Sequence, residues 1–241
     1  MPWRCEGVLF DYGRTLVTFE YPTEELLDVM RSFRPRIEAE LGAPAPPAET
    51  ILREVLIPLE EYVGSISEDE VDYMEIYRST WAKIGMRLSD QLLYEILDAE
   101  QLCWDRAVRL EPGALDLLAW LGSQGIKRGI CSNAPFPPEM MRRQLTSNGI
   151  AANVDAAVFS SEVGRRKPSP EVYRAALDAM GTPAERTLFV GDRVREDYSG
   201  PTAAGMRAVI VASRAESNLP EGIPTVPSIE DLRDLLRAAQ E

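Results

Sequence analysis

Short apolar runs alternate with helical patterns along most of this chain, and the alternation limits what its 241 residues can fold into. One run lies at residues 7–10 and ends at Asp11. Four more follow Pro112, at residues 126–131, 156–159, 187–190 and 208–211. Buried strands that are separated by helices are typical of right-handed β-α-β crossovers. The sequence therefore predicts an α/β fold, a doubly wound parallel sheet that forms a Rossmann-like core.

A long helical stretch separates the first expected strand from the other four. Between about Thr23 and Asp105, apolar residues recur every three or four positions, as they do on one face of a helix. Pro35 falls inside the first of these helices, and we expect it to kink or split that helix. The pattern predicts an all-helical cap at residues 20–106, inserted into an α/β core made of residues 1–19 and 107–241.

The charges are unevenly distributed, and the chain contains no histidine. The formal net charge at pH 7 is −13, and residues 20–110 carry 20 acidic and 9 basic side chains. So acidic a chain is a poor match for the phosphates of nucleic acids, which attract Lys and Arg. Without histidine, Ser-His-Asp catalysis and His-ligated zinc are excluded. Imidazole chemistry and nucleic-acid binding are therefore not expected.

The cysteines and the apolar runs indicate where the protein resides. Cys5, Cys103 and Cys131 are an odd number without a CxxC pair, which is typical of reduced thiols in a cytoplasmic protein. No apolar run approaches the roughly 18 residues that a membrane span requires. The apolar stretch before Asp11 has four residues and is too short for a signal peptide. We expect a cytoplasmic protein without a membrane partner.

Polar residues follow the expected strands at the points where ligands bind in parallel sheets. Asp11, Ser132 and Asp192 stand at or just after strand ends, and Lys167 lies in a cationic loop after the third strand. Carboxylate oxygens favour Mg²⁺ over softer metals. A Mg²⁺ ion beside a lysine suits a phosphoryl group, and an exposed aspartate can act as a nucleophile.

Four segments resemble, in order, the motifs of the haloacid dehalogenase-like hydrolase superfamily. They are VLFDYGRTL, GICSN, RRKPSPEVY and LFVGDRVREDYSGPTAAGM. The helical insert is similar to the superfamily's cap of the first type. The resemblance spans nearly the whole chain, and it implies a Mg²⁺-dependent phosphatase that works through an aspartyl phosphate.

The resemblance also implies a role for each matching position. Asp11 would be the nucleophile, Ser132 would hydrogen-bond the phosphoryl oxygens, and Lys167 would neutralise charge between them. Asn133, Arg14 and Thr15 are further candidates, the first two for substrate binding. The implied metal ligands are Asp11, Asp192, Asp197 and the carbonyl of Gly13.

Gly13 departs from the superfamily's pattern. Phosphatases of this superfamily usually carry a second Asp there, which protonates the leaving oxygen and later activates water. Such acid–base help is worth about 10² to 10⁴ in rate. We therefore expect a preference for good leaving groups, such as acyl or aryl phosphates, or a proton donor from the cap.

Three other functions stay open. The chain could be a weakened family member that binds a ligand or protein without turnover. It could be a 2-haloacid dehalogenase, although the acidic pair Asp192 and Asp197 argues against a metal-free enzyme. It could cleave phosphonates through a Schiff base, for which Lys83 is the candidate.

The surroundings of the site are expected to be ordinary. The acidic cap favours a small substrate with one phosphate and a neutral or cationic remainder. We expect the protein to be a monomer or a homodimer. Tyr73, Tyr77 and Trp81 share helical spacing and are expected to pack inside the cap. We expect solvated surface charges at Arg165, Arg166, Arg193 and Arg195.

Overall fold

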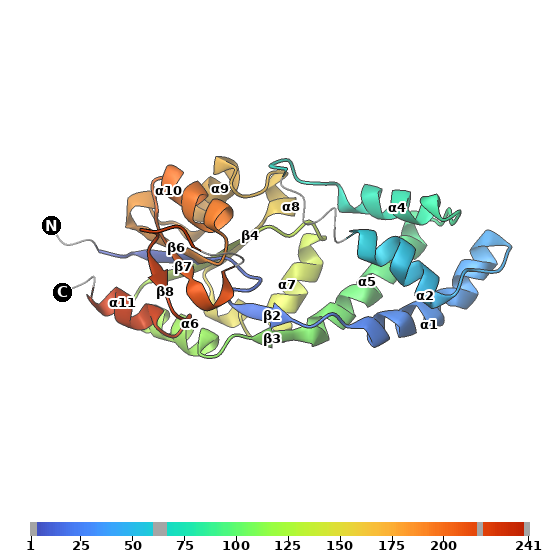
Figure 1. Cartoon of the computed structure of the whole chain (residues 1–241), viewed down its shortest axis with the longest axis horizontal. Helices are drawn as coiled ribbons and strands as arrows, with labels where there is room; N and C mark the ends of the chain where they lie inside the picture. Colours follow the sequence, from blue (N-terminus) through green and yellow to red (C-terminus); the bar gives the residue numbers. More distant parts are fainter. Residues whose placement is uncertain (1–3, 60–66, 216–218, 239–241) are drawn as a thin grey trace.

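The computed structural model describes residues 4–59, 67–215 and 219–238. Its centre is a parallel sheet of six strands in the order β5-β4-β1-β6-β7-β8 (Figure 1). The strands are β1 (Gly7–Phe10), β4 (Lys127–Ser132), β5 (Ala156–Phe159), β6 (Thr187–Gly191), β7 (Arg207–Val211) and β8 (Thr225–Val226). The order runs outward from β1 in both directions, which confirms the predicted doubly wound fold.

Strand β1 lies at the middle of the sheet because both of its faces are apolar. Val8 and Phe10 belong to one core cluster, which includes residues of α6 (Ala114–Ser123). Leu9 belongs to a second cluster, which includes residues of α9 (Pro170–Met180). The remaining helices of this part are α7 (Pro138–Ser147), α8 (Ser160–Val163), α10 (Gly200–Ala203) and α11 (Leu232–Ala238). Helices α9 and α10 cover one face of the sheet and α6 and α11 the other (Figure 1).

A separate helical segment lies between β2 (Val17–Phe19) and β3 (Val108–Leu110) along the chain. Its elements are α1 (Thr23–Leu41), α2 (Ala48–Ile51), η1 (Leu52–Leu56), α4 (Tyr73–Lys83) and α5 (Asp90–Ala107). They share a core of their own, in which Tyr77 and Trp81 are fully buried as expected. Helix α1 continues through Pro35, so the proline does not split it, and the alternative expectation of a kink stays a prediction. The division into a core and a cap at the predicted boundaries stays a prediction.

Three short strands were not among those expected from the sequence. β2 and β3 pair antiparallel where the chain leaves the sheet region and returns to it. β8 adds two residues to the sheet edge beside β7. Runs of two or three residues are too short to show a period, so the pattern of the sequence does not reveal them. In the described residues, we find no helix with the length and apolar character of a membrane span.

Candidate active site

Three polar residues meet because the strands that carry them are neighbours. Strands β4 and β6 flank β1 in parallel register, one on each side. Ser132 is the last residue of β4, and Asp11 and Asp192 directly follow β1 and β6. Their side chains therefore share the carboxyl edge of the sheet, where open α/β sheets bind ligands.

The carboxylate of Asp11 is held by two donors. Ser132 Oγ and Lys167 Nζ each donate to Asp11 Oδ1 at 2.8 Å. Lys167 is 3% exposed and Asp11 is 9% exposed. Burial opposes the charge on Lys167, but the carboxylates of Asp11 and Asp197 outweigh it and raise the pKa of this amine well above its ordinary value. Lys167 is therefore a constant cation beside Asp11.

Lys167 is positioned from both ends. Its Nζ donates to Asp197 Oδ1 at 2.7 Å. Its backbone N–H donates to Asn133 Oδ1 at 2.7 Å, and Asn133 Nδ2 donates to the Lys167 carbonyl at 3.2 Å. The Asn133 amide thus fixes the loop that carries Lys167, and its expected contact with substrate stays a prediction.

Asp197 is fully buried and closes the loop after β6. Its Oδ2 accepts from the backbone N–H groups of Asp192 and Arg193, each at 3.0 Å. Gly191 permits this approach, because a Cβ there would lie 2.3 Å from Asp197 Cγ. Burial raises the pKa of Asp197 to about 6, although Lys167 counteracts the effect.

The acidic residues of the site are crowded. Asp11, Asp192 and Asp197 each place an oxygen within 4.8 Å of the other two. Burial, reinforced by the charges on Asp11 and Asp197, raises the pKa of Asp192 to about 8. Asp192 Oδ2 is buried and accepts no hydrogen bond from the described residues. Crowded carboxylates, one of which has a buried oxygen without a hydrogen bond, fit a hard divalent cation such as Mg²⁺.

The four predicted metal ligands do not fit equally well. Asp11 and Asp192 have carboxylate oxygens available, whereas both oxygens of Asp197 already accept hydrogen bonds. The geometry therefore favours Asp197 as a support for Lys167 and for the loop rather than as a direct ligand. The carbonyl of Gly13 stays a predicted ligand.

Arg14 brings a second cation to the edge of this cluster. Its φ of 62° lies in the left-handed region, which residues other than glycine rarely adopt. Its Nε lies 3.2 Å from Asp192 Oδ2, and its Nη2 donates to the Arg214 carbonyl at 3.0 Å. Thr15 is fully buried, and the described residues give its hydroxyl no hydrogen-bond partner. The substrate-binding role of Arg14 stays a prediction.

Among the described residues, the side chain nearest to Gly13 is not an acid. A Cβ at Gly13 would lie 3.2 Å from Cζ of Phe19, so an aromatic ring occupies the space nearest this position. The hydroxyl of neighbouring Tyr12 accepts a hydrogen bond from Asn148 at 2.8 Å. Burial raises the pKa of the Tyr12 phenol above its usual range.

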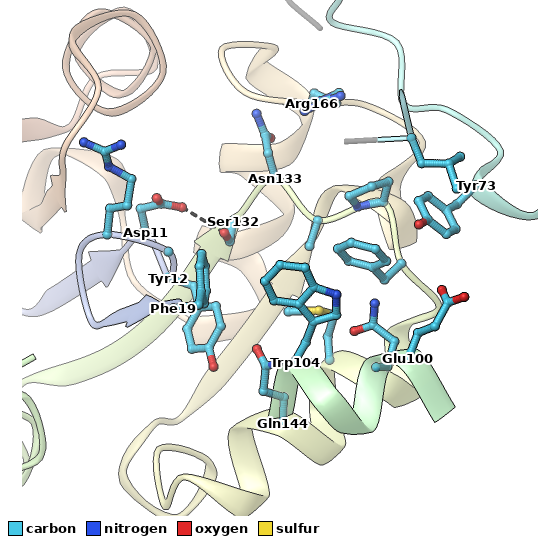
Figure 2. A pocket seen from close by; sticks show the side chains of 18 of the residues that line it. Asp11, Tyr12, Phe19, Tyr73, Glu100, Trp104, Ser132, Asn133, Gln144 and Arg166 are labelled. Atoms are coloured by element: carbon cyan, nitrogen blue, oxygen red, sulfur yellow. Dashed lines mark hydrogen bonds between the residues drawn. The ribbon is translucent and has the colours of Figure 1, made fainter. Parts of the chain in front are cut away.

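A cavity of about 550 Å³ connects the sheet edge to the helical segment. Asp11, Ser132 and Lys167 line one part of it, together with Gly13, Arg14, Asn133 and Asp192. The helical segment contributes Leu26, Leu56, Leu59, Tyr73, Glu100, Gln101 and Trp104. In Figure 2, Asp11 and Ser132 lie on one side and Tyr73 and Glu100 on the other, with Trp104 between them. The side that carries Asp11 and the side that is lined by the helical segment are thus separate parts of one pocket.

Several residues of the pocket differ from the sequence expectations. Arg166 is 4% exposed and lines the cavity, so its assignment as a solvated charge was wrong. Tyr73 contacts Tyr77 as expected, but it also lines the cavity. Lys83 is not among the described residues of the lining, which leaves the phosphonate mechanism without its amine.

Glu100 is the lining residue for which the sequence held an unused signal. It follows Ile96 and Leu97 on the apolar stripe of α5, where a charged residue is out of place. The aromatic lining, by contrast, could not be separated from core residues by spacing alone. Phe19 and Trp104 come together only through folding, with ring centroids 6.3 Å apart.

Comparison with known proteins gives the family. A model of the haloacid dehalogenase-like hydrolases matches residues 5–205, from before β1 to beyond Asp197. The chain belongs to the haloacid dehalogenase-like hydrolase family. The match includes Asp11, Ser132, Lys167 and Asp192, the residues that meet at the sheet edge.

Two curated relatives are phosphatases by name. The phosphoserine phosphatase of Thermus thermophilus is 33% identical over 133 residues, which cover 55% of this chain and 52% of that protein. The chain thus spans about half the length of this relative. The glyceraldehyde 3-phosphate phosphatase of Methanopyrus kandleri is 27% identical over 241 residues, which cover 98% of this chain and 97% of that protein.

A solved structure with a similar fold has a different enzyme name. The 2-haloacid dehalogenase from Pseudomonas syringae pv. Tomato DC3000 has a TM-score of 0.70 and 20% identity, covering 97% of this chain and 99% of that one. At this identity the likeness shows the fold alone.

Proposed function

We propose that this hydrolase is a phosphatase that acts on a small phosphorylated metabolite, with Asp11 as its nucleophile. The observation that carries the proposal is the pairing of Asp11 Oδ1 with Ser132 Oγ and Lys167 Nζ at the edge of a cavity. Two donors fix one oxygen of the carboxylate, and the other is available for attack. The phosphatase names of the relatives support the same reaction.

The reaction has two displacements at phosphorus. Asp11 attacks the phosphoryl group, the bond to the leaving oxygen breaks, and the leaving group departs with the electron pair. Ser132 and Lys167 donate to the phosphoryl oxygens, whose negative charge they offset. Water then attacks the aspartyl phosphate, which releases inorganic phosphate, restores the carboxylate and gives a proton to solvent.

Mg²⁺ would be held by Asp11 and Asp192, with Gly13 as a further candidate ligand. Such an ion supplies charge stabilisation and orientation for a phosphoryl group. The acidic helical segment and the size of the cavity support the proposed partners, which are a phosphorylated metabolite and neither nucleic acid nor membrane. A cytoplasmic location and a monomeric or homodimeric state stay predictions.

The experiment that tests this function measures inorganic phosphate released from a panel of aryl and alkyl phosphates with Mg²⁺. Asp11→Asn keeps the size of the side chain but removes the nucleophile, and we expect a loss of at least about 10³-fold in kcat. A chelator should abolish the activity of the unaltered protein. Hydrolysis of no phosphate ester would favour the binding-module alternative, and full activity in Asp11→Asn would show that Asp11 is not the nucleophile.

A second candidate is 2-haloacid dehalogenation, which the geometry of Asp197 keeps open. Because both oxygens of Asp197 are used by Lys167 and the loop, its presence has a structural reason that requires no metal. Gly13, which offers no acid, is also compatible with attack on carbon. Halide release from a 2-haloacid in the presence of a chelator would favour this candidate, and its absence would remove it.

A further inference from the structure

Part of the pocket has aromatic walls. Tyr21 and Trp104 meet edge to face with ring centroids 5.2 Å apart, and the ring centroids of Tyr73 and Phe136 lie 4.8 Å apart. All four residues line the cavity. Rings that support one another in this way give rigid apolar walls. They suit a leaving group with a flat apolar body.

One carboxyl group interrupts these apolar surroundings. Glu100 lines the cavity and is 4% exposed. Its Oε1 accepts a hydrogen bond from Tyr77 Oη at 2.7 Å. Among the described residues, no Lys or Arg nitrogen lies within ion-pair distance of this carboxylate. A buried carboxyl without a cationic partner is costly, so its position calls for an explanation.

The immediate chemistry of Glu100 suits a cation supplied by a ligand. An ammonium group gains a charge-assisted hydrogen bond from a carboxylate and a favourable contact with the faces of aromatic rings. Residues 20–110, which include Glu100, Tyr73 and Trp104, carry 20 acidic and 9 basic side chains. The field of the helical segment therefore attracts a cation to the same end.

We infer that the substrate is a phosphate monoester whose leaving group has an aromatic or apolar body and ends in an ammonium group bound by Glu100. Asp11 and Glu100 lie on opposite sides of Trp104 in Figure 2, so phosphoryl and ammonium groups would occupy opposite ends of one molecule. Glu100 is then the residue that determines specificity. This inference rests on the proposed phosphatase function and adds the substrate class to it.

The experiment compares two aryl phosphates that differ only in charge: tyramine phosphate and 4-propylphenyl phosphate. In the unaltered protein, kcat/KM for tyramine phosphate should exceed that for the neutral ester by at least about 10-fold, an ordinary difference for one ion pair. Glu100→Gln keeps the shape and the acceptor for Tyr77, and it should reduce that preference about 10-fold. Glu95→Gln changes a partly exposed carboxylate on the same helix, which pairs with Arg36, and it should leave the preference unchanged.

A binding measurement separates failure of this inference from failure of the phosphatase proposal. Calorimetry with tyramine itself, which has no phosphate, should show binding that Glu100→Gln weakens and Asp11→Asn does not. If both esters are hydrolysed equally, or if the preference survives in Glu100→Gln, the inference is wrong and the phosphatase proposal stands. If neither ester is hydrolysed but tyramine binding depends on Glu100, the ammonium site stands and the phosphatase proposal fails.

Discussion

Gly13 lies two positions after Asp11, and its nearest side chain is the ring of Phe19. We predict that Gly13→Asp raises kcat/KM for alkyl phosphates by about 10- to 100-fold, because a carboxyl there can protonate a poor leaving group. Aryl phosphates, whose phenolates leave without help, should change less. Phe19 is 44% exposed and can move the few tenths of an ångström that the new side chain requires. Initial rates for alkyl and aryl esters measure this effect.

Gly13→Asn is the control for that prediction, because its side chain has nearly the same size and carries no acidic proton. It should leave the ratio of alkyl to aryl rates as it is in the unaltered protein. Equal gains in the two variants would mean that shape, not proton transfer, limits the reaction. A ratio that Gly13→Asp does not change would show that another residue already supplies the proton.

The burial of Glu100 also leads to a prediction about stability. Burial raises its pKa to about 8 from an ordinary 4.5, so without a bound cation the folded protein keeps a proton that the unfolded chain loses between these values. The folded state binds more protons across this window, and its free energy of unfolding therefore falls as pH rises. Glu100→Gln removes that penalty. Between about pH 5 and pH 8, the free energy of unfolding of Glu100→Gln should therefore exceed that of the unaltered protein by on the order of a few kcal/mol.

Urea denaturation at several pH values measures this difference, with Glu95→Gln as the partly exposed control. The control should show no comparable pH-dependent gain. If Glu100→Gln is less stable than the unaltered protein at pH 8, the carboxyl is ionised and satisfied in the folded state. The description of Glu100 as a buried carboxyl without a cationic partner would then be wrong.

Single residues could be assigned from the sequence where their position follows from the sheet. Asp11, Ser132 and Asp192 stand at strand ends, and parallel strands bring their ends together. The burial of Arg166 could not be predicted in this way. The backbone N–H of Arg166 donates to the carbonyl of Glu68, and the Arg166 guanidinium lies 3.9 Å from the carboxylate of Glu70. Only folding brings these two residues close to Arg166.

At the scale of elements, the end of β6 and the short helical segment η4 (Val194–Ser199) depend on one close approach. A Cβ at Gly191 would lie 2.3 Å from Asp197 Cγ, and Asp197 is fixed by Lys167 and two backbone groups. We predict that Gly191→Ala lowers the free energy of unfolding by about 1–3 kcal/mol. Chemical denaturation measures the loss.

Gly13→Ala provides the comparison for that prediction. Its Cβ would meet only the mobile end of an exposed ring, at 3.2 Å, so its effect on the free energy of unfolding should be small. Should Gly191→Ala prove as stable as Gly13→Ala, the approach of Asp197 to the strand end is looser than the structure indicates.

The sequence predicted long elements better than short ones. Helices α4 and α5 follow from apolar residues at helical spacing, and the central strands follow from apolar runs. Strands β2, β3 and β8 have two or three residues and no readable period. Helix α1 shows a different limit. It packs against α5 and continues through Pro35, so packing outweighs the local cost of the proline.

At the scale of the whole molecule, the site is assembled from two parts of the chain. The sheet edge supplies Asp11 and its donors, and the helical segment supplies Trp104 and Glu100. The two parts also meet beyond the pocket, where Arg143 of α7 pairs with Asp98 and Asp105 of α5. Motifs in the sequence predicted the first part. The second depends on how the helices pack onto the sheet, so no linear pattern described the complete pocket.

The most direct test of the central claim is a rapid-mixing measurement of phenolate release from an aryl phosphate with Mg²⁺. If Asp11 forms an aspartyl phosphate, and if Gly13 gives no help to the water that cleaves it, the first turnover should be faster than the later ones. We predict a burst approaching one phenolate per protein chain, followed by a slower steady rate, and no burst in Asp11→Asn. Linear release that persists in Asp11→Asn would contradict covalent catalysis by Asp11.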